Sequence, residues 1–271
     1  MIENSDFIES LYAGILGRPS DEGGRRLFVD RLSTEGAVGV INEFLESKEG
    51  RDRSLSRMLV GELESKRNTE TQLISLGTHC YTSFFLKKVG LKKKSTPFDW
   101  IFSSPLMIVD CLKDDFSQFL NRDHYQVRDA DPHSPVQHLY YREKFGIDSM
   151  FNHHRVDLDH DYAYMVRCVE RFRALAKSQE EKLFILFRRF DGNLNSDFEV
   201  LADSLQAYAS NFKFVYISVS PHDDNMFPRV TLEKKTQNLA LYRLHCVGEW
   251  HDLYFDDVVN EIAITRILQS L

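Results

Sequence analysis

The sequence lacks any long apolar run, because no window approaches the roughly 18 consecutive apolar residues of a membrane helix. Its first residues also lack the basic-then-apolar pattern of a signal peptide. Cysteine is scarce: the four cysteines are widely spaced and form no CxxC pair, which fits neither a disulfide framework nor a structural zinc site. We therefore expect a cytoplasmic protein with no membrane span.

Positive charge is also in short supply, since 34 Lys and Arg face 41 Asp and Glu for a net charge of −7. Nucleic acids and anionic membranes are bound by fields of Lys and Arg, so we expect no nucleic-acid partner. Glycine and proline are few, at 13 and 7 residues, and we find no internal repeat or low-complexity tract. The chain is therefore neither fibrous nor disordered and should fold around a core.

The pattern of apolar residues changes near residue 68. Between Ser5 and Leu16, and again up to residue 63, apolar side chains recur at the spacing of helix faces. A polar stretch at about residues 64 to 71 follows and predicts a linker. We therefore divide the 271 residues into an all-helical N-terminal module, residues 1–67, and a second domain, residues 68–271.

The second domain alternates short apolar runs with helix-length patterns. The runs have the length of strands, and this alternation predicts an α/β fold with a helix-covered, mainly parallel sheet. Strands are expected at residues 73–76, 183–187, 212–219 and 239–247, and helices at about residues 81–89, 105–120, 161–176, 197–209 and 256–268.

Cys80 is the first candidate for chemistry. The segment from Ser75 to Tyr81 leaves a predicted strand, turns at Gly77 and enters a predicted helix, which places Cys80 in the first helical turn. The unsatisfied N–H groups there favour a thiolate, so we expect a lowered thiol pKa and fast alkylation near neutral pH. The alternative is a buried cysteine that acts as a small apolar side chain. The other three cysteines, on apolar faces of predicted helices or strands, fit that alternative: Cys111, Cys168 and Cys246.

Asp99 is unusual because it stands between Phe98 and Trp100 in an apolar segment that also contains Pro97. A carboxylate in such surroundings must be hydrogen-bonded or paired, so Asp99 is a candidate to orient a histidine or to bind a substrate group. The alternative is an aspartate of a turn or helix cap. The nearby lysines, residues 92 to 94, are expected to form a solvated turn.

These segments together resemble a known family. The motifs are Ser75-Leu76-Gly77-x-x-Cys80, Ser95-x-Pro97-Phe98-Asp99-Trp100, Phe151-x-His153-His154 and Phe187-Arg188. Over about residues 72 to 260 they are similar to a bacterial family of unknown function labelled papain-like cysteine peptidases. The resemblance implies that Cys80 is the nucleophile, that His153 or His154 is its base, and that Asp99 belongs to the same site.

The N-terminal module has a resemblance of its own, over about residues 5 to 50. The matching residues are Phe7, Leu11-Tyr12, Leu16-Gly17-Arg18-Pro19, Asp21-x-x-Gly24 and Phe28. They resemble a short helical domain of unknown function found in bacterial surface and glycan-related proteins. The resemblance implies association rather than catalysis, and so a possible protein partner for this module.

The predicted strand that precedes Cys80 also suggests a comparison with acyl-transfer hydrolases whose nucleophile follows the first strand of a parallel sheet. A late histidine supplies the base in many of those enzymes, which makes His251 the rival of His153 and His154. The run from His153 to Asp161 holds three His and three Asp, but consecutive residues cannot all face one ion. We expect no metal and no cofactor.

We predict a cysteine hydrolase or acyltransferase that acts on a small-molecule, peptide or glycan substrate. Substrate binding is assigned to Arg188, which follows a predicted strand, and to His79 and Trp100. The alternative function is a glycan-binding or sugar-phosphate-binding, transferase-accessory protein of bacterial polysaccharide metabolism, in which Cys80 is structural and Arg188 with Asp99 binds the ligand.

Overall fold

The computed structural model describes residues 3–54, 71–129, 134–189, 194–220, 227–251 and 254–271. The chain divides into two compact units, Met1–Ser65 and Lys66–Leu271. Residues 64–70 of the predicted linker, and the helical pattern predicted between residues 55 and 63, lie outside the described residues.

The described part of the N-terminal unit is helical, as its apolar spacing predicts. Helix α1, Asn4–Leu11, continues into a wider turn, Tyr12–Leu16, and α2, Glu22–Glu46, is broken at Gly36. Ile8, Tyr12 and Phe44 lie in its small core, and the rings of Tyr12 and Phe44 pack edge to face.

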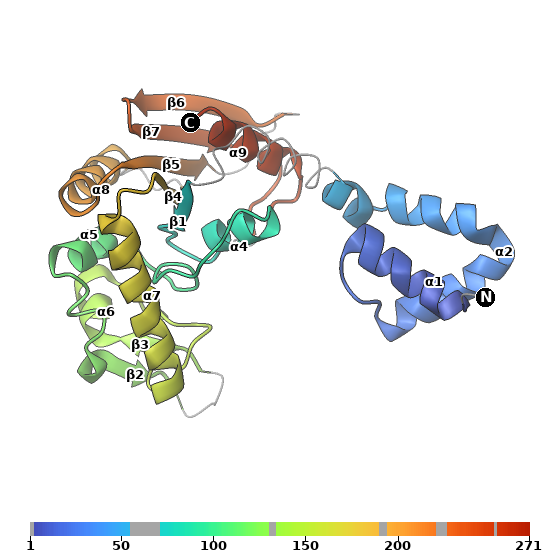
Figure 1. The fold of residues 1–271 in the computed structure, drawn as a ribbon, viewed down its shortest axis with the longest axis horizontal. Helices are drawn as coiled ribbons and strands as arrows, with labels where there is room; N and C mark the ends of the chain where they lie inside the picture. The colour runs from blue at the N-terminus through green and yellow to red at the C-terminus, as the bar shows by residue number, and fades with distance from the viewer. Residues whose placement is uncertain (1–2, 55–70, 130–133, 190–193, 221–226, 252–253) are drawn as a thin grey trace. The chain divides into compact units, whose positions relative to one another are not determined.

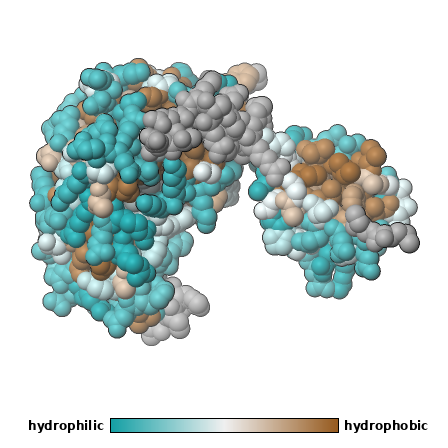
Figure 2. All heavy atoms as spheres, in the orientation of Figure 1, coloured by the Kyte–Doolittle hydropathy of each residue, from teal (hydrophilic) through white to brown (hydrophobic). Residues whose placement is uncertain are grey.

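The same unit also exposes apolar side chains, which Figure 2 shows gathered on one of its faces. The exposed large apolar residues of α2 are Leu27, Val38 and Leu45. A partner for this module stays a prediction.

The second unit is built on a five-stranded sheet in the order β1-β4-β5-β7-β6. Strands β1, β4, β5 and β7 run parallel, and β6 pairs with β7 antiparallel. The predicted α/β class, with a mainly parallel, helix-covered sheet and a helical N-terminal region, is confirmed. The strands are β1 Gln72–Ser75, β4 Lys182–Arg189, β5 Phe212–Ser220, β6 Arg229–Lys235 and β7 Leu239–His245.

Helices cover both faces of this sheet (Figure 1). The larger core lies on one face, where side chains of α5, α7 and α8 meet Phe184, Phe214 and Leu241 of the strands. Helices α4 and α9 lie on the other face and are joined by the ion pair of Lys88 and Glu261. Their bounds are α4 Tyr81–Lys88, α5 Pro105–Lys113, α7 Asp159–Lys177, α8 Leu194–Tyr208 and α9 Val259–Gln269.

Several elements differ from the expectation. The helix predicted over residues 105–120 ends at Lys113, and Asp115 and Phe116 then take positive φ angles. A small sheet of β2, Tyr125–Val127, and β3, Val136–His138, followed by α6, Leu139–Phe145, was not predicted. No helix in the described ranges is long and apolar enough to cross a membrane.

Candidate active site

Cys80 stands at the strand-to-helix turn that its sequence context predicts. Strand β1 ends at Ser75, and Cys80 is the N-cap residue of α4. The turn between them is tight at Gly77, where a Cβ atom would lie 2.6 Å from the carbonyl oxygen of His79. Glycine is therefore needed for the chain to bend here, and the bend places Cys80 at the carboxyl-terminal edge of the sheet.

The thiol of Cys80 is buried, with the residue 6% exposed. Burial, together with the negative charge of Asp99, raises the pKa of the Cys80 thiol. The expected lowering by the helix N-terminus is thus wrong in direction, because desolvation of the thiolate outweighs the favourable N–H groups. Cys80 is a neutral thiol at rest, and among the described residues no hydrogen bond joins its Sγ to a histidine nitrogen.

Asp99 is 1% exposed, and its carboxylate has two hydrogen-bond donors and one ion-pair partner. Oδ2 accepts a hydrogen bond from the Thr96 N–H at 2.6 Å, and Oδ1 accepts one from the Thr96 hydroxyl at 3.1 Å. The ion-pair partner is Lys92, whose Nζ lies 2.6 Å from Oδ2. Burial raises the pKa of Asp99, and Lys92 opposes that shift. The carboxylate is buried and bonded as predicted, but its partners are a threonine and a lysine rather than a histidine.

Lys92 corrects the prediction of a solvated turn. Lys93 and Lys94 are exposed, but the side chain of Lys92 is only 7% exposed and ends on Asp99. A signal for this contact was present in the sequence, since a carboxylate inside an apolar segment needs a positive or hydrogen-bonding partner. Lys92 lies seven residues before Asp99 in the sequence.

A single loop connects the Cys80 turn, residues 76–80, to the segment that carries His153 and His154. The backbone N–H of Ser103 donates to the carbonyl oxygen of Thr78 at 3.0 Å. The Ser103 hydroxyl donates to the carbonyl oxygen of Gly77 at 2.8 Å. The neighbouring N–H of Phe102 donates to the carbonyl oxygen of Met150 at 2.9 Å. The structure thus brings the loop containing Asp99 against both segments.

The two adjacent histidines have different surroundings. His153 is exposed, and its ring centroid lies 6.0 Å from that of Trp100. The side chain of His154 is 20% exposed, with Nδ1 3.9 Å from Asp161 Oδ2 and the ring centroid 4.8 Å from that of Tyr164. Burial lowers the pKa of His154, so its imidazole is neutral at pH 7. A neutral imidazole is able to accept a proton.

The three residues assigned to substrate binding have different partners. Trp100 is half-buried beside His153. His79 accepts a hydrogen bond from the Tyr81 N–H at its Nδ1 atom, 3.1 Å away, and its ring packs on Trp250 with centroids 4.8 Å apart. Arg188 forms an ion pair with Asp197 of α8. Its guanidinium is therefore already engaged by a carboxylate.

His251 lies in a loop anchored by Trp250, which we call the His251 loop, residues 248–251 and 254–256. His251 Nε2 is 2.8 Å from Asp256 Oδ1, and Asp256 Oδ2 accepts a hydrogen bond from the Glu249 N–H at 2.9 Å. The side chain of His251 is 36% exposed. Its sequence neighbour Asp252 lies outside the described residues.

The remaining cysteines are buried, as predicted. Cys111 Sγ lies 3.2 Å from the Tyr141 hydroxyl, and Cys246 donates to the carbonyl oxygen of Ser220 at 3.2 Å. Across the described residues, no three or more His, Cys, Asp or Glu side chains are grouped as a metal site would require.

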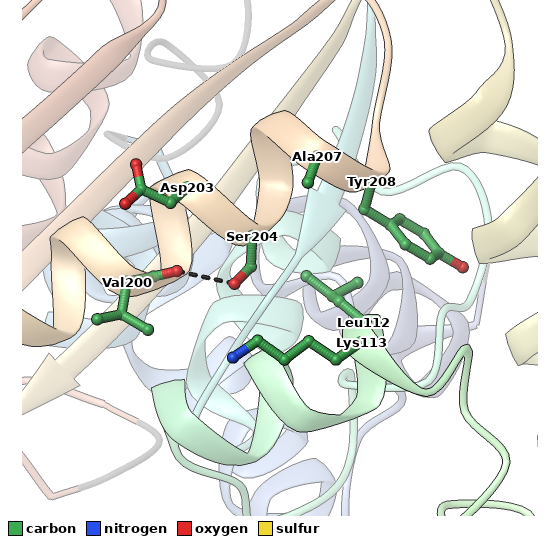
Figure 3. A pocket seen from close by; sticks show the side chains of 7 residues that line it. All are labelled: Leu112, Lys113, Val200, Asp203, Ser204, Ala207 and Tyr208. Atoms are coloured by element: carbon green, nitrogen blue, oxygen red, sulfur yellow. Dashed lines mark hydrogen bonds between the residues drawn. The ribbon is translucent and has the colours of Figure 1, made fainter.

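A cavity of about 500 Å³ lies away from these residues, between α5 and α8 (Figure 3). Leu112, Val200 and Tyr208 supply apolar walls, and the Ser204 hydroxyl donates to the carbonyl oxygen of Val200 within α8. None of the site residues predicted from the sequence lines this cavity.

Two comparisons with known proteins bear on these residues. A family model described as "Putative papain-like cysteine peptidase (DUF1796)" matches residues 71–220, which include Cys80, Asp99, His153 and His154 but not His251. An uncharacterized protein of Acanthamoeba polyphaga mimivirus, R408, is 26% identical over 195 residues, covering 62% of this chain and 86% of the viral protein. No solved structure matches the chain.

Proposed function

Since the chain belongs to the family described as "Putative papain-like cysteine peptidase", whose model matches residues 71–220, we propose that it is a cysteine hydrolase with Cys80 as the nucleophile. One observation carries the proposal. Cys80 is the N-cap of α4 at the end of the turn that follows β1, and the loop that holds Asp99 is hydrogen-bonded to the same turn. Cys80 and Cys246 both follow parallel strands at the edge of the sheet where α/β folds bind ligands, and of these two only Cys80 lies in the segment that the family model matches.

The matched segment supports a base from the adjacent histidines, and we assign this role to His154. His154 is neutral at pH 7 and has a carboxylate and an aromatic ring against it, whereas His153 is exposed beside Trp100. His153 and Trp100 are then placed to contact substrate. Asp99, with Lys92, anchors the loop that joins the Cys80 turn to the histidine segment.

The proposed reaction is acyl transfer to water. His154 takes the thiol proton as Cys80 sulfur attacks the carbonyl carbon, so that a C–S bond forms and the charge develops on oxygen. The imidazolium then gives its proton to the leaving amine or alcohol as that bond breaks. Water, deprotonated by the same imidazole, cleaves the thioester and restores the thiol. The hydrogen bond between thiol and imidazole forms in the substrate complex, as catalytic hydrogen bonds often do.

The experiment uses p-nitrophenyl acetate, an activated acyl donor, with the wild type and a Cys80→Ala variant. We expect nitrophenol release with an acetyl group on Cys80, found by peptide mass spectrometry, and loss of release in the variant. Cys246→Ala is the matched control because Cys246 is also a buried thiol, and it should keep the wild-type rate. Release that persists without Cys80, or a Cys80 that takes up no acetyl group, would overturn the proposal and leave Cys80 structural.

A further inference from the structure

Helix α7 presents four polar or reactive side chains at helical spacing: Asp161, Tyr164, Cys168 and Arg171. Residues three and four apart lie on one face of a helix, so these four form a single stripe. Arg171 donates to the carbonyl oxygen of Ser95, at the start of the segment containing Asp99. The charges of Asp99 and Lys92 act on the pKa of the Cys168 thiol, Asp99 raising it and Lys92 lowering it. The stripe therefore faces the proposed site.

The first two residues of the stripe meet His154. Asp161 Oδ2 lies 3.9 Å from His154 Nδ1, and the Tyr164 ring lies against the imidazole with centroids 4.8 Å apart. Because Nδ1 is the ring nitrogen on the side of Asp161, the proposed function assigns proton exchange with the thiol to the other nitrogen, Nε2. A carboxylate at one nitrogen and a ring against the face fix the orientation of an imidazole.

We infer that α7 positions the base, with Asp161 and Tyr164 as positioning residues for His154. The inference rests on the proposed function, because it concerns the orientation of the base that acts on Cys80. It assigns to Asp161 the role of orienting carboxylate that the sequence suggested for Asp99. Asp99 is paired with Thr96 and Lys92. Asp161 also accepts a hydrogen bond from the Arg155 N–H, but the same oxygen lies 3.9 Å from Nδ1 of His154.

Other charged groups near His154 act mainly through Asp161. Asp161 Oδ1 lies 2.9 Å from His160 Nδ1, and Asp161 Oδ2 accepts a hydrogen bond from the Arg155 N–H at 2.7 Å. The Arg155 guanidinium is itself paired with Asp157. His153 is the other titratable neighbour, and a positive charge on it disfavours protonation of His154. The negative charge of Asp161 is therefore the main electrostatic support for an imidazolium at His154.

The test compares Asp161→Asn and Tyr164→Leu, each with a matched control on the same helix. Asp159→Asn is the carboxylate control, because Asp159 pairs with Arg122 and is 91% exposed. Tyr162→Leu is the aromatic control, because the Tyr162 hydroxyl donates to the carbonyl oxygen of Leu120 instead of facing His154. Two readouts are used: the pKa of His154 by NMR titration, and the pH profile of acylation by p-nitrophenyl acetate.

The two variants should shift the pKa of His154 in opposite directions. Asp161→Asn removes a favourable charge and should lower this pKa by about half a unit or more. Tyr164→Leu removes part of the burial and should raise it toward the ordinary value of about 6.5. The acid limb of the acylation profile should follow each shift, and the plateau rate should fall about tenfold in both because the ring is no longer held. The controls should leave both readouts unchanged.

Unchanged His154 titration in both variants would overturn the inference, even if Cys80 remains the nucleophile. A Cys80 that is never acylated would instead refute the proposed function, while the NMR titration would still report on the contacts of His154. If Tyr164→Leu fails to fold cooperatively, the Asp161→Asn variant decides, because the Asp161 side chain is 24% exposed and its replacement is tolerated better. A wild-type titration of His154 in that variant counts against the inference.

Discussion

Two histidine–carboxylate pairs flank the Cys80 turn, and they differ in nearly every property. His251 is joined to Asp256 by a 2.8 Å contact in a partly exposed loop. His154 is 3.9 Å from Asp161, less exposed, and packed against an aromatic ring. The shorter contact belongs to the pair outside the family match, and the longer one to the pair inside it.

The difference teaches that a short contact between histidine and carboxylate does not identify a base by itself. Asp256 closes a local loop: its second oxygen accepts a hydrogen bond from the Glu249 N–H, and its Cβ lies 2.8 Å from where a side chain on Gly248 would begin. The His251 pair therefore fits a role in shaping that loop. Asp161 and His154 are also close in sequence, since the His154 loop leads into the first turn of α7, but they lie within the family match and His154 is packed against the Tyr164 ring.

The largest effect should come from replacing each of the two histidines with alanine in turn. His154→Ala should slow acylation of Cys80 by p-nitrophenyl acetate at least about 100-fold, which is the usual contribution of a general base. His251→Ala should change the rate less than about threefold. The measurement is the single-turnover rate of Cys80 acylation at about pH 7.5. The reverse ranking would break the comparison and make His251, with Asp256, the base.

The sequence was sufficient for the class of fold and for the Cys80 turn. Apolar runs of strand length between helix-length patterns predicted β1, β4, β5 and β7, because these strands are buried on both faces. Strand β6 was missed because it is an exposed edge strand that carries charged residues and no buried face.

The site was predicted only in part, because contacts between distant segments leave little trace in one sequence. The motifs marked Cys80 and Asp99, and the apolar segment predicted that Asp99 is buried. They could not show that the partner of Asp99 is Lys92, since lysines in a row usually lie in water. The stripe from Asp161 to Arg171 was not predicted, although its residues have helical spacing, because packing decides which face of α7 meets the His154 loop.

The next effect concerns the buried carboxylate beside Cys80. Lys92→Met should lower the free energy of unfolding by about 3 kcal/mol or more, because it leaves Asp99 buried without its positive partner. The double variant Lys92→Met with Asp99→Asn should recover much of that loss, since the unpaired charge is gone. Chemical denaturation at pH 7 measures both. If the double variant is as unstable as the sum of the two single variants, the pair is not coupled.

The third prediction concerns His138, whose titration contributes to unfolding of the protein in acid. Burial lowers the pKa of His138 to about 4, and its Nε2 atom is bonded to the Gln118 carbonyl oxygen. Because the folded pKa lies below the unfolded value of about 6.5, the unfolded chain binds more protons between these pH values. Stability from the neutral His138 is therefore complete above about pH 6.5 and is lost as pH falls toward 4.

The loss should approach about 1.4 kcal/mol per pH unit within that window, on top of the contributions of other groups. Denaturant unfolding at several pH values measures this loss. In a His138→Gln variant, the free energy of unfolding should change less steeply with pH, by the equivalent of about one bound proton. An unchanged slope would mean that His138 titrates normally. Comparisons of the two flanking histidines should accordingly be made above pH 6.5, where the fold is not responding to this group.

The smallest effect is expected at the pair with the shortest contact. Asp256→Asn should lower the free energy of unfolding by less than about 1 kcal/mol, because both partners are substantially exposed and water replaces the lost interaction. The asparagine can still accept hydrogen bonds from the Glu249 N–H or from His251, so the loop keeps its shape. Denaturation with and without about 1 M salt, at which the Debye length falls to about 3 Å, measures the exposed electrostatic part of this loss. A loss as large as that of Lys92→Met, or a strong fall in Cys80 acylation, would show that the His251 loop supports the site after all. The two histidine–carboxylate pairs would then differ only in the distance between the imidazole and the carboxylate.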